Sequence, residues 1–200
     1  MRDPRPREWL AAKVSRRHVG DYKPFVMVDG EGVRCSLYVS GCLFACEGCF
    51  NEAVWSFRYG QPYTAELEDR VLADLAQPYV QGLTLLGGEP FLNTGVCLEL
   101  VGRMRRELGR TKDVWAWSGY TFEELLADSE DKLALLREVD VLVDGRFRQD
   151  LKDTRLQFRG SSNQRLVDVP ASLAAGEVRL WGRRADAEST FEQVERRRLI

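Results

Sequence analysis

The chain has 200 residues, a formal net charge of -2, 44% hydrophobic residues and 30% charged residues, as in many globular proteins. This charge gives no global field for nucleic acid or an anionic membrane, and no apolar run approaches the ~20 residues of a spanning helix. A single histidine, His18, excludes serine triads and histidine-rich metal sites. The first residues lack the apolar stretch of a secretion signal, so we expect a cytoplasmic protein without nucleic-acid or membrane partners.

Apolar periodicity begins near residue 25, after a charged stretch with two early prolines. We therefore expect an N-terminal extension over 1–24, a main domain over 25–170 and a C-terminal extension over 171–200. Asp29-Gly30 indicates a turn between two strand-like runs. Apolar alternation and short buried runs predict strands at 33–39, 82–86, 113–117 and 138–145.

Helical patterns separate these strands. Thr64 is a candidate cap for a helix with Leu67, Val71 and Leu75 on one face, and a second helix covers 97–108. Thr121 and Glu124 fit a capping box at the start of a third helix. Strands that alternate with helices indicate an α/β fold with a parallel sheet, in which ligands bind at the carboxyl ends of the strands.

Three cysteines, Cys42, Cys46 and Cys49, occupy the stretch "GCLFACEGCF" with the spacing C-x3-C-x2-C. Thiolates on so short a loop can point at one small volume, and soft sulfur ligands suit zinc or an iron–sulfur cluster. A structural zinc ion needs a fourth ligand, whereas a [4Fe–4S] cluster with three protein ligands leaves one iron open. The remaining cysteines, Cys35 and Cys97, fit apolar core positions in a strand and a helix.

A second candidate stretch, Gly87-Gly88-Glu89-Pro90, follows the predicted strand 82–86. Its glycines allow close approach of the backbone, and Glu89 supplies a carboxylate for an ammonium group. Taken alone, the stretch also fits an ordinary turn at a strand end.

The cysteine spacing and "GGEP" together resemble the radical S-adenosylmethionine (SAM) superfamily. Further stretches over about residues 25–168, among them "DGEGVRCSLYVSGC", "WAWSGYTFEEL", "LVDGRFRQDLKD" and "RGSSNQR", are similar in order and spacing to the family of anaerobic ribonucleoside-triphosphate reductase-activating proteins. The resemblance implies a reduced, partly open (β/α) barrel with mainly parallel strands, formed by residues 25–170.

The resemblance also implies a site and a reaction. Cys42, Cys46 and Cys49 would hold one [4Fe–4S] cluster, whose open iron binds SAM. Contacts to SAM are implied for Gly48, Cys49, Phe50, Gly87, Gly88, Glu89 and Pro90. An electron from a flavodoxin-type donor would cleave SAM to methionine and a 5'-deoxyadenosyl radical, which removes a hydrogen atom from a glycine in the large subunit of the anaerobic ribonucleoside-triphosphate reductase.

Other strand-end residues have competing interpretations. Asp144, Ser118 and Tyr120 are either SAM contacts or local structure, Trp115 and Trp117 favour the core, and 159–165 is a candidate interface with the reductase. The basic end at 196–198 is most simply a solvated surface. Two rival functions are a small-molecule radical SAM enzyme similar to 7-carboxy-7-deazaguanine synthase, and a non-catalytic zinc or iron–sulfur interaction module.

Overall fold

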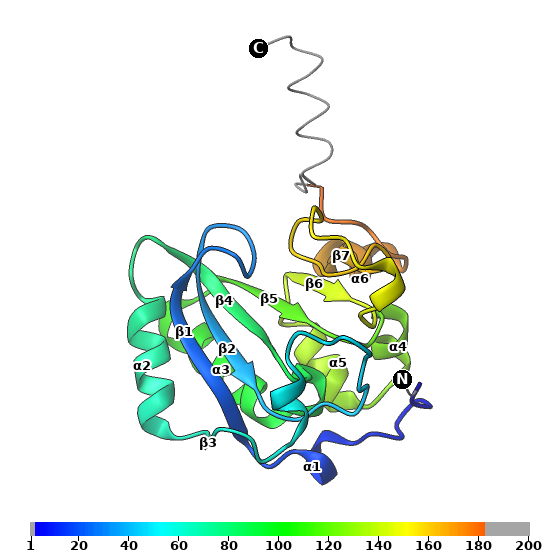
Figure 1. Cartoon of the computed structure of the whole chain (residues 1–200). Helices are drawn as coiled ribbons and strands as arrows, with labels where there is room; N and C mark the ends of the chain where they lie inside the picture. Colours follow the sequence, from blue (N-terminus) through cyan, green and yellow to red (C-terminus); the bar gives the residue numbers. More distant parts are fainter. Residues whose placement is uncertain (1–2, 183–200) are drawn as a thin grey trace, which may run out of the picture.

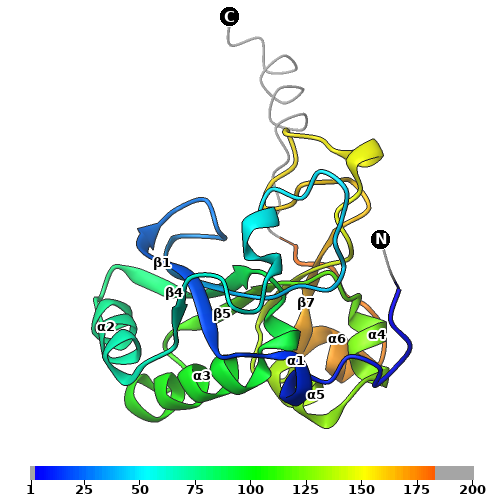
Figure 2. The same ribbon diagram turned by 60° about the horizontal axis from the view of Figure 1, so that its bottom comes forward.

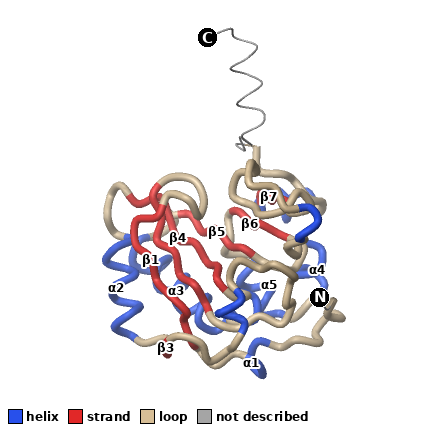
Figure 3. Tube along the Cα trace, viewed as in Figure 1, coloured by secondary structure: helices blue, strands red, loops and turns tan. Residues whose placement is uncertain are grey.

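One seven-stranded sheet organises residues 3–182, which are the residues that the computed structural model describes. Figure 1 shows its strands running side by side, and Figure 3 shows them in red among the loops. The strands are β1 (His18–Val26), β2 (Val33–Val39), β3 (Gln61–Pro62), β4 (Val80–Gly87), β5 (Asp113–Trp117), β6 (Val141–Asp144) and β7 (Arg165–Asp168).

The strand order in the sheet is β3-β1-β2-β4-β5-β6-β7. The central strands β2, β4, β5 and β6 are parallel, while β1, β3 and β7 pair antiparallel at the two sides. This arrangement confirms the α/β class and the expected parallel strands. The sheet is open within the described residues, so the barrel is not confirmed and stays a prediction.

Helices connect the strands. They are α1 (Ala11–Val14), α2 (Ala65–Leu75), α3 (Thr94–Leu108), α4 (Phe122–Ala127), α5 (Glu130–Leu136) and α6 (Val169–Ala175), with short 3-10 turns η1 (Glu52–Trp55), η2 (Pro90–Leu92) and η3 (Gln149–Leu151). Figure 2 shows α2, α3 and α5 gathered on one face of the sheet. Apolar side chains from these helices and from alternate positions of the strands form the large core, in which Cys35 and Cys97 are fully buried, as expected.

The predicted helix starts are confirmed by their caps. The Thr64 hydroxyl accepts a hydrogen bond from Leu67 N at 3.3 Å at the start of α2. At α4, Glu124 N donates to Thr121 Oγ1 at 3.2 Å, and Thr121 N donates to the Glu124 carboxylate at 2.8 Å. Each cap satisfies backbone N–H groups that have no partner inside the helix.

The opposite face of the sheet carries a smaller aromatic cluster. Trp115 from β5 packs with Phe158 and Trp181, at ring-centroid distances of 5.3 and 6.1 Å. The expectation that Trp115 is a core residue is therefore confirmed. Among residues 3–182, no helix has the length and apolarity needed to cross a membrane.

The predicted division of the chain stays a prediction, and two elements run across its boundaries. Strand β1 passes residue 24, and α6 passes residue 170. Most of the predicted C-terminal extension, including its basic end at 196–198, lies outside the described residues.

Candidate functional site

The three cysteines of the short loop line one cavity. Strand β2 ends at Val39, and the chain then forms the loop 40–50, here called the cysteine loop. Cys42, Cys46 and Cys49 border a cavity of about 160 Å³, here called the cysteine cavity. Its other lining residues are Phe44, Asn51, Trp55, Leu86, Gly87, Gly88, Glu89, Trp117, Ser118, Gly119, Gly145, Phe147 and Gln164.

The cysteines surround this cavity without converging on a point. Within residues 3–182, no three side chains of His, Cys, Asp or Glu are placed to hold one metal ion together. A [4Fe–4S] cluster makes a different demand, because each thiolate binds a different iron at a separate corner. Thiols spread around a common cavity fit that demand.

The "GGEP" stretch is joined to the cysteine loop through the backbone. Gly88 N donates to Val39 O at 2.7 Å, and Glu89 N donates to Gly41 O at 2.9 Å. A Cβ atom on Gly88 would lie 2.6 Å from Gly41 O, which is closer than a side chain can approach. Gly88 is therefore required by this close approach of two backbones.

Glu89 fixes the end of strand β4 to the end of β5. Its carboxylate is 1% exposed and accepts hydrogen bonds from Ser118 Oγ at 2.9 Å, Gly119 N at 2.8 Å and Phe91 N at 3.1 Å. Burial is the largest cause that raises the pKa of Glu89 to about 7, and these uncharged donors lower it. A cation placed in the cavity would favour the ionised carboxylate.

Burial also raises the pKa values of two cysteines. The pKa of Cys42 rises to about 12, mainly through desolvation and further through the charge of Glu89. The pKa of Cys46 is raised by burial and by the neighbouring Cys49. Both thiols are protonated at neutral pH, so binding of iron would release their protons.

Gly48, Phe50 and Pro90, which the resemblance implies as SAM contacts, do not line the cysteine cavity. Phe50 is 99% exposed, and with Gly48 and Cys49 it borders a neighbouring cavity of about 380 Å³. Gly48 has φ +69°, and a Cβ atom there would lie 2.3 Å from Gln149 Oε1. Pro90 is buried at the start of η2. Gly87, Gly88 and Glu89 do line the cysteine cavity.

The remaining strand-end residues divide between the cavity and the scaffold. Ser118 lines the cysteine cavity, whereas Tyr120 is 1% exposed and packs behind Phe44. Trp117, which the sequence pattern assigned to the core, stacks on Trp115 with ring centroids 5.9 Å apart. It is also partly exposed and lines the cavity, because it ends β5 at this edge. Gln164 also lines it, and only its place in "RGSSNQR" could have suggested this.

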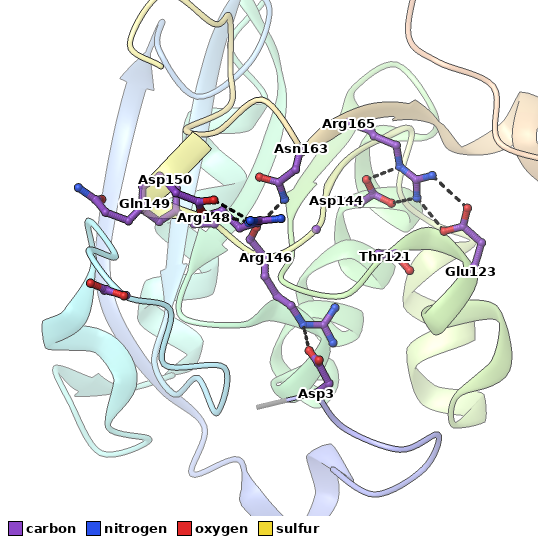
Figure 4. A pocket seen from close by; sticks show the side chains of 13 residues that line it. Asp3, Thr121, Glu123, Asp144, Arg146, Arg148, Gln149, Asp150, Asn163 and Arg165 are labelled. Atoms are coloured by element: carbon purple, nitrogen blue, oxygen red, sulfur yellow. Dashed lines mark hydrogen bonds and ion pairs between the residues drawn. The ribbon is translucent and has the colours of Figure 1, made fainter. Parts of the chain in front are cut away.

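A larger cavity of about 1000 Å³, here called the charged cavity, shares Gly145 and Phe147 with the cysteine cavity. Figure 4 shows side chains that line the charged cavity. Arg146 donates to both oxygens of Glu124, at 2.8 and 2.9 Å, and lies 2.8 Å from Asp3 Oδ1. Arg165 donates to Asp144 and to Glu123. Asp144, which was weighed as a ribose contact, is thus held by Arg165 and also accepts from Phe122 N at 2.8 Å.

The comparisons with known proteins fit this site. The family model described as "4Fe-4S single cluster domain" matches residues 28–167, which include both the cysteine loop and "GGEP". The fold and the cavity thus agree with a single-cluster iron–sulfur domain.

Relatives define the family more closely. The anaerobic ribonucleoside-triphosphate reductase-activating protein of Pasteurella multocida is 46% identical over 147 residues, covering 72% of this chain and 92% of that protein. The protein of that name from Escherichia coli K12 is 45% identical, covering 72% and 93%. A third, from Enterobacteria phage T4, is 39% identical over 145 residues, covering 72% and 88%. The chain belongs to the family of anaerobic ribonucleoside-triphosphate reductase-activating proteins.

Proposed function

We propose that this chain is a radical SAM activase that generates a glycyl radical on an anaerobic ribonucleoside-triphosphate reductase. Its cofactors are one [4Fe–4S] cluster, held by Cys42, Cys46 and Cys49, and SAM. One observation carries the proposal: the three thiols and the backbone of Gly87–Glu89 border the same cavity.

When bound, the reduced cluster and SAM supply the chemistry: one electron splits SAM into methionine and a 5'-deoxyadenosyl radical, which takes a hydrogen atom from a glycine and leaves as 5'-deoxyadenosine. The protein contributes orientation and a shielded environment. Strand ends β2 and β4, tied by the hydrogen bonds from Gly88 and Glu89, hold the thiols and the glycines at a fixed separation. Buried neighbours such as Phe44 form an apolar part of the cavity wall.

The SAM contacts follow from the donors and acceptors at the cavity wall. Glu89 offers a buried carboxylate to the ammonium group of SAM, and that charge would lower its raised pKa again. Gly87 and Gly88 border the cavity with their backbone, and a Cβ atom on either would lie within 2.8 Å of the backbone of Tyr38 or Gly41. Gly48 and Phe50 border the neighbouring cavity beside Cys49, and we place the further SAM contacts at these three residues only.

The partners follow from the same arrangement. Because Gly145 and Phe147 line both the cysteine cavity and the charged cavity, a polypeptide loop of the reductase large subunit can approach the cysteines from the charged side. The incomplete sheet, which we interpret as a partly open (β/α) barrel of the radical SAM type, leaves this approach free. A flavodoxin-type protein supplies the electron, and the reaction takes place in the cytoplasm.

The test is anaerobic reconstitution with iron and sulfide, followed by reduction, addition of SAM and measurement of 5'-deoxyadenosine by chromatography, with and without the reductase. Cys46→Ala is the matched variant. We expect the nucleoside only with the unmutated chain, and a glycyl radical signal by electron paramagnetic resonance when the reductase is present. One zinc ion per chain and no nucleoside under either condition would overturn the proposal in favour of an interaction module.

A further inference from the structure

The N-terminal segment, residues 3–16, packs against the cysteine loop although it precedes the residues that the family model matches. Its Trp9 side chain is only 4% exposed and belongs to the large core. Figure 2 shows the segment in dark blue, passing close to α5 on its way to α1. A charged segment has thus become part of the scaffold of the site.

Three aromatic rings connect the segment to the cysteine loop. Trp9 meets Phe44 edge to face, with centroids 5.1 Å apart and planes at 69°. Tyr120 meets Phe44 at 4.9 Å and 78°, and meets Trp9 at 6.4 Å and 74°. Such edge-to-face contacts have a preferred geometry, so they fix ring orientation as well as burying surface.

Phe44 is the residue through which this packing reaches the thiols. It stands between Cys42 and Cys46 in the cysteine loop, is 1% exposed and lines the cysteine cavity. The guanidinium of Arg146 lies 4.8 Å from its ring centre, and a Cβ atom on Gly119 would lie 2.4 Å from its ring. Trp9 therefore closes the packing around a ring that already has close neighbours at Tyr120, Arg146 and Gly119.

A buried lysine holds the backbone of Trp9 in place. Lys132 Nζ donates to Trp9 O at 2.6 Å and to Asp128 Oδ1 at 2.8 Å, and lies 4.9 Å from the centre of the Tyr120 ring. The Lys132 side chain is fully buried. A buried ammonium group is tolerated only with such partners, so moving the Trp9 carbonyl would leave part of this charge unpaired.

A second link joins the segment to both sides of the cysteine cavity. Ser15 Oγ donates to Asn93 Oδ1 at 2.9 Å. The amide of Asn93 donates to Ser40 O and to Glu89 O, both at 3.1 Å. Asn93 thus bonds at once to the N-terminal segment, the start of the cysteine loop and the "GGEP" stretch.

We propose that Trp9 is a positioning residue for the iron–sulfur site, because through Phe44 it holds the loop between Cys42 and Cys46 in the conformation that binds the cluster. This inference rests on the proposed function only for the identity of the bound group. Residues that orient metal ligands without binding the metal commonly lower metal affinity by about 10- to 100-fold when they are replaced. We place Trp9 among such residues.

The first test needs no cluster. Reduced, metal-free protein is treated with iodoacetamide without oxygen, and labelling of Cys46 and of the fully buried Cys97 is followed by mass spectrometry. We expect Trp9→Leu to raise the labelling rate of Cys46 about tenfold, as for the loss of the Trp9–Phe44 contact, while the labelling rate of Cys97 stays unchanged. Trp9→Phe, which keeps an aromatic edge, should stay close to the unmutated chain.

The matched control is Leu75→Ala, a fully buried position in α2. It destabilises the core without touching the cysteine loop. Trp9→Met, which fills space without an aromatic edge, is measured in the same way, so that unfolding of Trp9→Leu still leaves a decisive variant. If Trp9 variants and Leu75→Ala change the ratio of Cys46 to Cys97 labelling equally, Trp9 contributes only general stability and the proposal is wrong.

The second test measures release of iron from reconstituted protein to a chelator without oxygen. We expect release about tenfold faster from Trp9→Leu than from Leu75→Ala, with recovery in Trp9→Phe. Equal release from both would overturn the positioning role. Failure of the unmutated chain to take up a cluster would count against the proposed function, while the labelling ratio would still decide the role of Trp9.

Discussion

The two cavities that share Gly145 and Phe147 differ in size and in chemistry. The cysteine cavity is about 160 Å³ and is bordered by thiols, glycines and aromatic rings. The charged cavity is about 1000 Å³ and is bordered by arginines that pair with acidic residues. The small cavity is bordered by thiols of the kind that bind iron–sulfur clusters, whereas the large one is bordered by paired charges.

Because of this difference, we expect substitutions around the two cavities to have different effects. In our proposal, residues around the cysteine cavity serve ligand chemistry, and Gly88 also allows the close backbone approach to Gly41. Residues around the charged cavity hold one another through ion pairs, so their loss should affect stability and docking more than cluster binding. Three substitutions test that division, and a fourth tests the neighbouring cavity of about 380 Å³ beside Cys49, in order of decreasing expected effect.

Cys46→Ala should abolish cluster binding, because a thiolate ligand has no substitute in an alanine side chain. Iron and sulfide content after anaerobic reconstitution would fall from about four irons per chain to near zero. Cys97→Ala is the control: Cys97 is fully buried in α3 and outside the cavity, so the cluster should remain. Equal iron loss in both variants would contradict the assignment of ligands.

Gly88→Ala should destabilise the chain by about 1–3 kcal/mol, because the added Cβ atom would press on the backbone of Gly41. Thermal unfolding of the metal-free protein measures this effect. Gly95→Ala in α3 is the matched control, since a Cβ atom there lies 3.7 Å from its nearest neighbour. That control should be stabilising by about 0.5–1 kcal/mol, and similar behaviour of the two variants would argue against the tight contact.

Arg165→Gln should cost about 1–3 kcal/mol of stability at neutral pH, because it removes the cation from the buried Asp144. Chemical denaturation measures the loss, while iron content after reconstitution should stay at the level of the unmutated chain. A large fall in iron content would show that cluster binding in the cysteine cavity depends on the ion pairs of the charged cavity.

The hydrogen bond from Arg165 also holds the pKa of Glu123 below its usual range. For a depressed carboxyl pKa, the stabilisation is complete above the unfolded value of about 4.3 and disappears as the pH falls through the folded value. Glu123 is largely exposed, so solvent screening keeps this contribution small. Because Arg165→Gln removes this contribution, the free energy of unfolding of the variant should decrease less steeply than that of the unmutated chain as the pH is lowered.

Arg159→Ala should have the smallest effect, a decrease of roughly fivefold in activation of the reductase, as for a charge at the rim of an interface. Arg159 borders the cavity beside Cys49. Formation of 5'-deoxyadenosine without the reductase should not change. Arg110→Ala, at an exposed position between α3 and β5, is the control. Parallel loss of SAM cleavage and activation in Arg159→Ala would exclude a purely docking role.

Much of this site was predictable from local patterns. Alternation around Cys35 and the short run before Gly87 located strands β2 and β4, and the carboxyl ends of parallel strands meet at one edge. The cysteine loop and "GGEP" therefore had to be neighbours. Trp117 packs against the smaller aromatic cluster, as a core residue would, but it also lines the cavity. A strand pattern gives the face on which a side chain lies but does not show where the covering layer ends.

The N-terminal contribution could not be predicted, because it depends on contacts between distant parts of the chain. Trp9 and Lys132 are 123 positions apart, and neither has a local pattern that indicates the other. A lone tryptophan among charged residues suggests an extension until its partners Phe44 and Tyr120 are known. The fold, rather than the composition of the segment, decides that it is buried.

The backbone ties of the cysteine loop have a consequence for protein design. Gly41 N donates to Val54 O at 2.7 Å, Cys42 N donates to Trp55 O at 3.1 Å, and Gly41 O accepts from Glu89 N at 2.9 Å. The conformation of the loop is thus dictated by η1 and by the end of β4 as much as by its own sequence. Transplanting the three cysteines to another sheet would carry over the proposed cluster ligands but lose their spacing. A portable version must include both strand ends and η1.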